Sequence, residues 1–214
     1  SLTKPLELKK KKEKKWFEKF RWFKSSEGFL ILIGKDSSTN ELLIKRYTNV
    51  DDLVLHPDLH GAPFAVIKCE GKTPSEATIK EAATAVASYS KAWALDLGAI
   101  DVYWVKPEQV TKKPPSGQYI EKGMFMIYGP RNYIRGVELK LSIGVIKENE
   151  ELKIISGPSS TIKKTALTFV EIAPGEFKSK DLAKQILQKL IEKAPEKIKE
   201  KIKSLNLIDI QNLI

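Results

Sequence analysis

The stretch Val54-Leu-His-Pro-Asp-Leu-His-Gly-Ala-Pro63 contains both histidines of the chain, His56 and His60. Apolar residues precede it at 53–56 and follow it at 64–68, and their length and β-branched content predict two strands. The prolines and the glycine between them define a tight loop, because proline restricts φ and glycine permits turn conformations. The sequence therefore predicts a sheet in which two strands flank the most chemically distinctive loop of the chain.

His56, Asp58 and His60 are candidates for several kinds of site. Alternate side chains of an extended segment share a face, so the three could converge on a metal ion and form a metal-dependent hydrolase. A His–Asp pair could also transfer protons. No further histidine and no nucleophile in a recognisable context accompanies them. The other interpretations are a loop held by its own hydrogen bonds and an RNA contact, since imidazole stacks on bases and donates to phosphate.

Hydrophobic periodicity outlines the rest of the fold. Continuous or alternating apolar residues predict strands at 29–33, 100–105, 123–128, 137–145, 152–155 and 165–172. Helices are predicted at 6–24, at 41–47 behind a Ser38–Glu41 capping box, from a Thr73–Glu76 capping box to Leu97, and on both sides of Pro195.

The segment that ends at Leu97 is the clearest helix, and its many alanines allow close packing against a sheet. We therefore predict an α+β fold, with a mixed or antiparallel sheet packed by this helix. The expected organisation is a basic N-terminal helix at 1–24 that ends a coiled coil, an α+β domain at 25–177, and a helical C-terminal tail at 178–214.

Positive charge is concentrated at the two ends of the chain. The net charge of +10 includes ten Lys or Arg against three Glu in residues 1–24, and nine Lys against four acidic residues in 178–203. Clustered charge of this kind is typical of nucleic-acid binding. The alternative is a pair of solvated lysine-rich helices.

Several classes of protein do not fit the composition. The single cysteine, Cys69, cannot form an internal disulfide or complete a structural zinc site, which favours a reducing, cytoplasmic compartment. Phosphate-binding glycine motifs are absent. The high charge content is typical of heat-adapted proteins. We expect no catalytic residues, no metal and no cofactor.

Cations next to aromatic or loop residues are the candidate RNA contacts. Aromatic side chains stack on bases, and cations neutralise phosphates. With the three residues of the histidine loop, the predicted contacts are Arg21, Trp22, Lys24, Lys45, Arg46, Lys112, Lys113, Arg131 and Asn132. For Phe17, Phe20 and Phe23 we favour a place in the hydrophobic core.

A set of ordered motifs spans residues 16–135. In chain order they are Trp16–Gly28, Asp58-Leu-His-Gly61, Tyr89-Ser-Lys-Ala-Trp93, Tyr103-Trp-Val105, Gln109–Gly117 and Lys122-Gly-Met-Phe-Met-Ile127. They resemble the RNA-binding domain in the C-terminal half of NFACT proteins, the ribosome-quality-control family that is also labelled fibronectin-binding protein-like. With the composition, the resemblance suggests an archaeal or thermophilic source.

The resemblance implies a function in translation. Full-length NFACT proteins bind large ribosomal subunits that carry stalled peptidyl-tRNA, so the implied partners are large-subunit RNA and tRNA. The chain would be a fragment, with the last turns of a coiled coil followed by the RNA-binding domain, and not an enzyme. A protein-docking module, with a partner at the coiled-coil end, is the remaining alternative.

Overall fold

The computed structural model describes residues 14–176 and 181–214, and its largest element is an antiparallel sheet of six strands. Their order is β1 (Arg21–Lys24), β2 (Leu30–Ile33), β4 (Ala65–Lys68), β3 (Leu53–Pro57), β5 (Ala99–Val105) and β8 (Asn132–Glu138). Strands β3 and β4 pair with each other and flank the histidine loop, as predicted. The fold is α+β, and this sheet is antiparallel between all neighbours.

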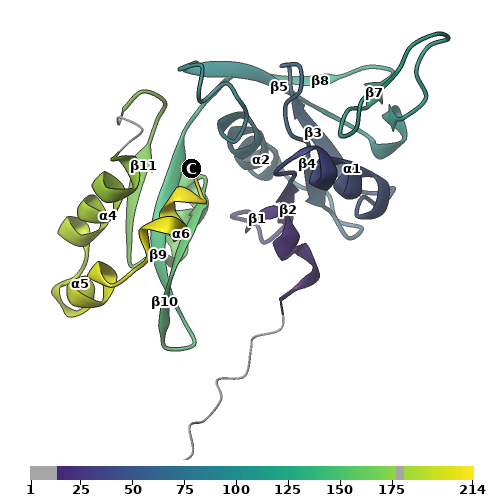
Figure 1. Cartoon of the computed structure of the whole chain (residues 1–214). Coiled ribbons are helices and arrows are strands. Elements are labelled where there is room, and N and C mark those ends of the chain that lie inside the picture. The colour runs from purple at the N-terminus through teal and green to yellow at the C-terminus, as the bar shows by residue number, and fades with distance from the viewer. Residues whose placement is uncertain (1–13, 177–180) are drawn as a thin grey trace, which may run out of the picture.

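Helices cover both faces of this sheet (Figure 1). Helix α2 (Glu76–Ser88) packs its alanines against one face, and α1 (Ser37–Arg46) buries Leu43 against the other. The predicted Ala-rich helix against a sheet is therefore confirmed. A two-stranded pair, β6 (Val110–Thr111) and β7 (Met126–Ile127), follows the short 3-10 helix η2 (Pro107–Gln109).

The ends of these two helices differ from the prediction. Helix α2 is capped by Ser75, and it ends at Ser88 instead of Leu97. The hydroxyl of Ser90 donates to the carbonyl of Ala87 at 2.6 Å. A side chain thus competes with the backbone for a helical carbonyl, and the chain continues in turns after Ser88. In α1 the cap is Asp36, not Ser38, and Asp36 Oδ1 accepts from Thr39 N at 2.8 Å.

The predicted N-terminal helix is wrong over the part that the structure describes. Trp16–Lys19 forms a 3-10 turn, η1, and Arg21–Lys24 is strand β1, while residues 1–13 lie outside the described residues. Pairing with β2 overrides the helical pattern, because alternation on a strand puts Phe23 in the core under α2 and Trp22 on the opposite face. Phe20 and Phe23 are buried, and Phe17 packs against the core, as predicted.

The predicted strand at 137–145 is divided between two sheets. Strand β8 ends at Glu138, and β9 (Leu141–Glu148) begins a separate antiparallel sheet with β10 (Glu151–Gly157) and β11 (Thr168–Ile172). The predicted strand at 123–128 shortens to β7. At the crossing, Ser88 Oγ accepts from Lys140 N at 2.9 Å, and its hydroxyl lies 2.7 Å from the carbonyl of Thr84 and 3.2 Å from that of Lys140. The end of α2 thus fixes the place where the chain changes sheets.

The second sheet has its own hydrophobic core. Helix α3 (Ser159–Thr165) packs against it, and α4 (Leu182–Lys193), α5 (Glu196–Lys203) and α6 (Leu207–Gln211) complete that core (Figure 1). Helices α4 and α5 were predicted, and their inner residues Ile186, Leu190 and Ile202 are fully buried. How the chain divides into domains stays a prediction.

A buried ion pair ties α1 to the central strands. Lys68 Nζ bonds to Asp52 Oδ2 and to the carbonyl of Tyr47, which lies at 2.7 Å. Asp52 is fully buried, and its carboxylate also accepts from Asn49 N at 2.7 Å and Cys69 N at 3.0 Å. Because both charges are out of water, each depends on the other.

Asp52→Asn leaves the Lys68 ammonium buried without its counter-charge, so we expect the free energy of unfolding to fall by about 3–5 kcal/mol. Urea denaturation measures the change. Asp51→Asn is the matched control, since Asp51 is exposed and an amide oxygen still accepts from Gly71 N. Equal stability of the two variants would contradict the structural importance of the pair.

Candidate nucleic-acid interface

The histidine loop is a tight turn between β3 and β4. Asp58 N donates to the carbonyl of Asp101 at 2.9 Å, which ties the loop to β5. His56 lies at the end of β3, and its Nε2 is 3.1 Å from the carbonyl of Ala62 across the loop. The loop is therefore held by hydrogen bonds that include one of its own imidazoles, as the simplest interpretation predicted.

His56 is set in an aromatic environment. Its ring centroid is 4.5 Å from that of Phe64 and 5.9 Å from that of Tyr103. Desolvation by burial lowers the pKa of His56 to about 4, despite the bond to the carbonyl of Ala62, which acts in the opposite direction. The imidazole is therefore neutral at neutral pH and contributes shape and a hydrogen bond, not charge.

The three polar residues of the loop do not form a metal site. Within residues 14–176 and 181–214, no group of three or more His, Cys, Asp and Glu is placed to hold a metal ion. His56 is half-buried, whereas Asp58 and His60 are exposed on the turn. The geometric basis for a metal-dependent hydrolase is therefore missing from the described residues.

Cations and aromatic rings alternate next to the loop. The guanidinium carbon of Arg131 is 4.5 Å from the ring centroid of Tyr103, whose ring meets that of Tyr133 at 5.6 Å. Arg135 lies over the other end of this row, 3.9 Å from the Tyr133 centroid, and also pairs with Asp101 at 2.9 Å. Tyr103 and Tyr133 are register partners on β5 and β8, so strand pairing builds the row.

Three hollows adjoin one another on this side of the molecule. The His-loop cavity, of about 170 Å³, is lined by the histidine loop, Tyr103 and Arg131. The central cavity, of about 490 Å³, shares His60 with it and continues to Lys35 and Arg21. Those last two residues also line the junction groove, of about 500 Å³, which lies between β1 and β10. Shared walls make the three hollows a continuous surface.

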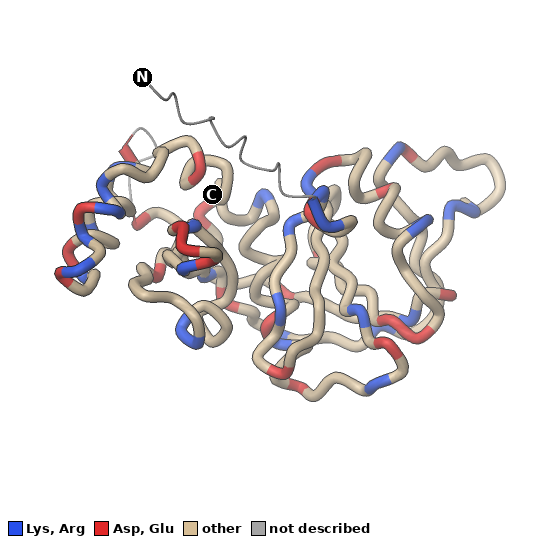
Figure 2. The backbone as a smooth tube through the Cα atoms, turned by 90° about the horizontal axis from the view of Figure 1, so that it is seen from below, with Lys and Arg blue, Asp and Glu red and all other residues tan. Residues whose placement is uncertain are grey.

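This surface is electropositive. Eight Lys or Arg and three Asp or Glu line the three hollows together. The cations come from loops, from strands of both sheets and from helix α3, and Lys and Arg are spread over both halves of the molecule (Figure 2). An excess of cations over carboxylates along a concave surface attracts polyanions.

The predicted contacts fall into two groups. Those that line the hollows are Arg21, Trp22, Lys24, His56, His60 and Arg131. The others lie outside these walls and are Lys45, Arg46, Asp58, Lys112, Lys113 and Asn132. In this second group Asn132 is bound to the protein itself, since its Nδ2 donates to the carbonyl of Trp104 at 3.2 Å.

Glu41 neutralises two of the predicted cations. Lys45 and Lys112 both lie 2.8 Å from its carboxylate, and Gly123 N donates to it at 2.7 Å. Desolvation alone would raise the pKa of Glu41, but the bonds from Lys112, Lys45 and Gly123 outweigh it and lower the pKa to about 2. These two lysines are therefore less available for a phosphate than the cations of the central cavity.

Sequence reasoning missed several cations that tertiary structure brings together. They are Lys35, Lys91 and Lys122 in the central cavity, and Lys153 and Lys164 in the junction groove. Each is an ordinary exposed lysine in its local sequence, so no local pattern marks it. Tyr133 and Arg135 were recoverable in principle, because they alternate on one strand.

Residues 19–129 match the family described as the NFACT protein RNA binding domain. The chain is 45% identical over 183 residues to the "Archaeal Rqc2 homolog aRqcH" of Methanocaldococcus jannaschii, which covers 85% of this chain and 27% of that protein. It is 43% identical over 129 residues to the human "Ribosome quality control complex subunit NEMF", covering 59% of this chain and 12% of the relative. The chain thus spans about a quarter or less of these relatives.

A structural comparison also matches the C-terminal part of the fibronectin/fibrinogen-binding protein from Streptococcus suis. The TM-score is 0.49 at 19% identity, over 77% of this chain and 54% of that one. No helix among the described residues is both long enough and apolar enough to cross a membrane.

The low pKa of His56 predicts how stability depends on pH. The folded protein resists protonation down to about pH 4, whereas the unfolded imidazole takes up a proton near pH 6.5. His56 therefore contributes stability above pH 6.5 that is lost as the pH falls toward 4, on the order of 2–3 kcal/mol.

In His56→Gln, urea denaturation from pH 7 to 4.5 should show a smaller fall in the free energy of unfolding than in the wild type. His60→Gln controls for the loss of one imidazole from the same loop and should keep the wild-type fall. Parallel curves for the wild type and His56→Gln would contradict a buried, neutral His56.

Proposed function

The chain belongs to the NFACT family through its RNA-binding domain, and from this premise we propose that it binds RNA along the His-loop and central cavities. The observation that carries the proposal is their shared electropositive wall. Arg131 lines the His-loop cavity, and Lys122, Lys91, Lys35 and Arg21 line the central cavity. A polyanion laid along this wall would meet cations from five separate loops or strands.

The chemistry of these cations favours binding to the RNA backbone. The chain has 33 Lys and four Arg, and an ammonium acts as a point charge toward phosphate instead of a fork that reads base edges. Exposed rings such as Tyr133 offer stacking to an unpaired base. The proposed ligand is therefore structured RNA, recognised by shape and phosphate position with few base-specific contacts.

The names of the relatives support a more specific partner. The human relative is called a ribosome quality control complex subunit. We propose that this chain, in the cytoplasm, contacts RNA of the large ribosomal subunit and tRNA on stalled complexes. Its proposed role there is binding and not catalysis.

The predicted contacts divide within this proposal. His60 and Arg131 line the electropositive wall of the His-loop cavity, and His56 shapes it. Arg46 and Lys113 are exposed and would extend the contact. Lys45 and Lys112 would contribute less, because both share Glu41, and Trp22 and Lys24 belong to the junction groove.

Binding to tRNA or to a fragment of large-subunit RNA should weaken steeply with salt, because each neutralised phosphate releases counterions. Arg131→Gln and Lys122→Gln should each weaken binding at moderate salt and reduce the log–log salt slope by about 0.7–0.9. Fluorescence anisotropy between low and moderate salt measures both quantities.

Lys147→Gln is the control, since this exposed lysine lies on the β9–β10 hairpin outside the three hollows and pairs with Glu150 at 3.2 Å. It should keep the wild-type slope. A flat salt dependence of the wild type, or equal effects of all three substitutions, would contradict the proposed wall.

A further inference from the structure

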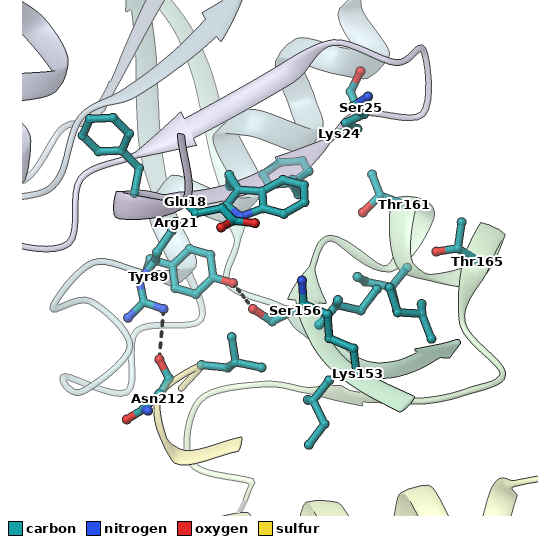
Figure 3. Close-up of a pocket in the computed structure, with 18 of the residues that line it drawn as sticks. Glu18, Arg21, Lys24, Ser25, Tyr89, Lys153, Ser156, Thr161, Thr165 and Asn212 are labelled. Carbon is teal, nitrogen blue, oxygen red and sulfur yellow. Dashed lines mark hydrogen bonds between the residues drawn. The ribbon is translucent and has the colours of Figure 1, made fainter. Parts of the chain in front are cut away.

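Two edge strands meet at the junction groove. Strand β1 is the edge of the six-stranded sheet, and β10 is the edge of the three-stranded sheet. Consecutive residues of each line the groove, namely 20–25 around β1 and 153–156 of β10. Because successive side chains alternate between the two faces of a strand, a wall built from consecutive residues is the edge of the strand. Figure 3 shows this groove, with Lys24 and Arg21 on one side and Lys153 and Ser156 on the other.

The edge of β1 presents unpaired backbone groups. Ser25 N donates to the carbonyl of Phe29 at 2.8 Å, in the same register as the β1–β2 ladder. Backbone pairing alternates along an antiparallel strand, so Arg21 and Phe23 bond to β2 while the N–H and C=O of Trp22 and Lys24 face outward. These outward groups form no hydrogen bond with any residue that the structure describes.

Strand β10 also has backbone groups that face away from its neighbouring strand. Asn149 and Glu150 both have positive φ, which makes a two-residue hairpin turn between β9 and β10. The pair that flanks such a turn is hydrogen-bonded, so alternation leaves the backbone groups of Ile154 and Ser156 facing away from β9. The side chain of Ser156 is held separately, since it shares a hydrogen bond with Tyr89 OH at 2.5 Å.

The rim of the groove is basic and its interior is largely apolar. Ile154, Ile155, Ile162 and Leu213 contribute to the interior, and the basic residues are Arg21, Lys24, Lys35, Lys153 and Lys164, against the carboxylate of Glu18. Within the described part of the chain, Arg21, Lys24 and Lys35 make no ion pair. An occupant would therefore combine apolar side chains with carboxylates.

We propose that the junction groove binds an extended acidic segment of a partner protein, which adds a strand to the free edge of β1. Peptide backbone supplies donors and acceptors at the spacing that β1 presents, and alternate side chains reach the apolar interior and the basic rim. RNA phosphates fit this edge less well, because they accept hydrogen bonds but donate none and so cannot pair with the carbonyls of Trp22 and Lys24. This binding mode shares Arg21 and Lys35 with the central cavity, whereas the edge of β1 lies outside the His-loop cavity.

The proposal is tested with a short, fluorophore-labelled peptide in which valine and aspartate alternate. Fluorescence anisotropy measures the affinity of this peptide for the whole chain. Lys24→Gln removes the rim charge and keeps the backbone N–H. Lys24→Pro removes the charge and also the outward N–H, without breaking a bond to β2, because proline is tolerated at the free side of an edge strand. We expect weaker binding by Lys24→Gln than by the wild type, and a further loss of about fivefold for Lys24→Pro, the value of one backbone hydrogen bond.

Amide chemical shifts of the unmodified chain give a second measurement that does not depend on a variant. Peptide addition should shift the amides of Trp22 and Lys24, with those of Ile154 and Ser156, and leave the surroundings of Arg131 unchanged. Equal affinities of folded Lys24→Gln and Lys24→Pro would refute strand addition. Equal binding of a valine–lysine peptide would refute the charge requirement, and displacement of the acidic peptide by an equal concentration of oligouridine would assign the groove to RNA.

Discussion

The contacts of Ser88 Oγ with the backbone N–H and carbonyl of Lys140 hold the position on which the rest of the molecule depends. They lie where the chain leaves the six-stranded sheet and enters the three-stranded sheet. Because Ser88 is the last residue of α2, the helix that packs on the first sheet also fixes where the second sheet starts. The junction groove exists because two sheets with separate cores are held next to each other at this crossing.

Further contacts across the groove fix the position of one sheet relative to the other. Lys164 Nζ, on α3, donates to the carbonyl of Ser26 at 2.9 Å, and Tyr89 OH bonds to Ser156 on β10. The guanidinium of Arg21 lies over the Tyr89 ring at 4.4 Å (Figure 3). These contacts orient the sheets, and Tyr89 and Trp93 pack against both hydrophobic cores. That arrangement leaves the edges of β1 and β10 open between them.

Pairing inside the protein decides which cations serve a ligand. Lys68 forms an ion pair with Asp52 in the core, and Lys45 and Lys112 both pair with Glu41 at the surface. Lys91 and Lys122 line the central cavity with Arg21, and no ion pair occupies Arg21 within the described residues. Net charge therefore indicates that the chain attracts polyanions, whereas the geometry of its carboxylates determines where a polyanion would lie.

Local pattern was enough for much of this protein. Apolar runs and β-branching identified the two strands around the histidine loop, the Ala-rich helix and the C-terminal helices, because those segments bury one face or both whatever their partners are. The ordered motifs identified the family. The exclusion of an internal disulfide followed from the single cysteine, and that of phosphate-binding glycine loops followed from the absence of their motifs. Local pattern gave the wrong prediction where the structure depends on contacts between distant parts of the chain. Arg21–Lys24 is a strand because it pairs with β2. The alternation through 137–145 continues across the point where the chain passes from one sheet to the other.

The candidate interface also shows what local sequence patterns cannot predict. His60, Arg131 and Arg21 were identified from sequence because rare residue types or aromatic neighbours mark them, but Lys35, Lys91 and Lys122 are distinctive only by position. Sequence by itself determined the family, the α+β class and the electropositive character, all of which depend on composition and local periodicity. Only tertiary structure decided which cations share a surface and which strand edges stay open, because both depend on contacts between residues that are distant in the chain.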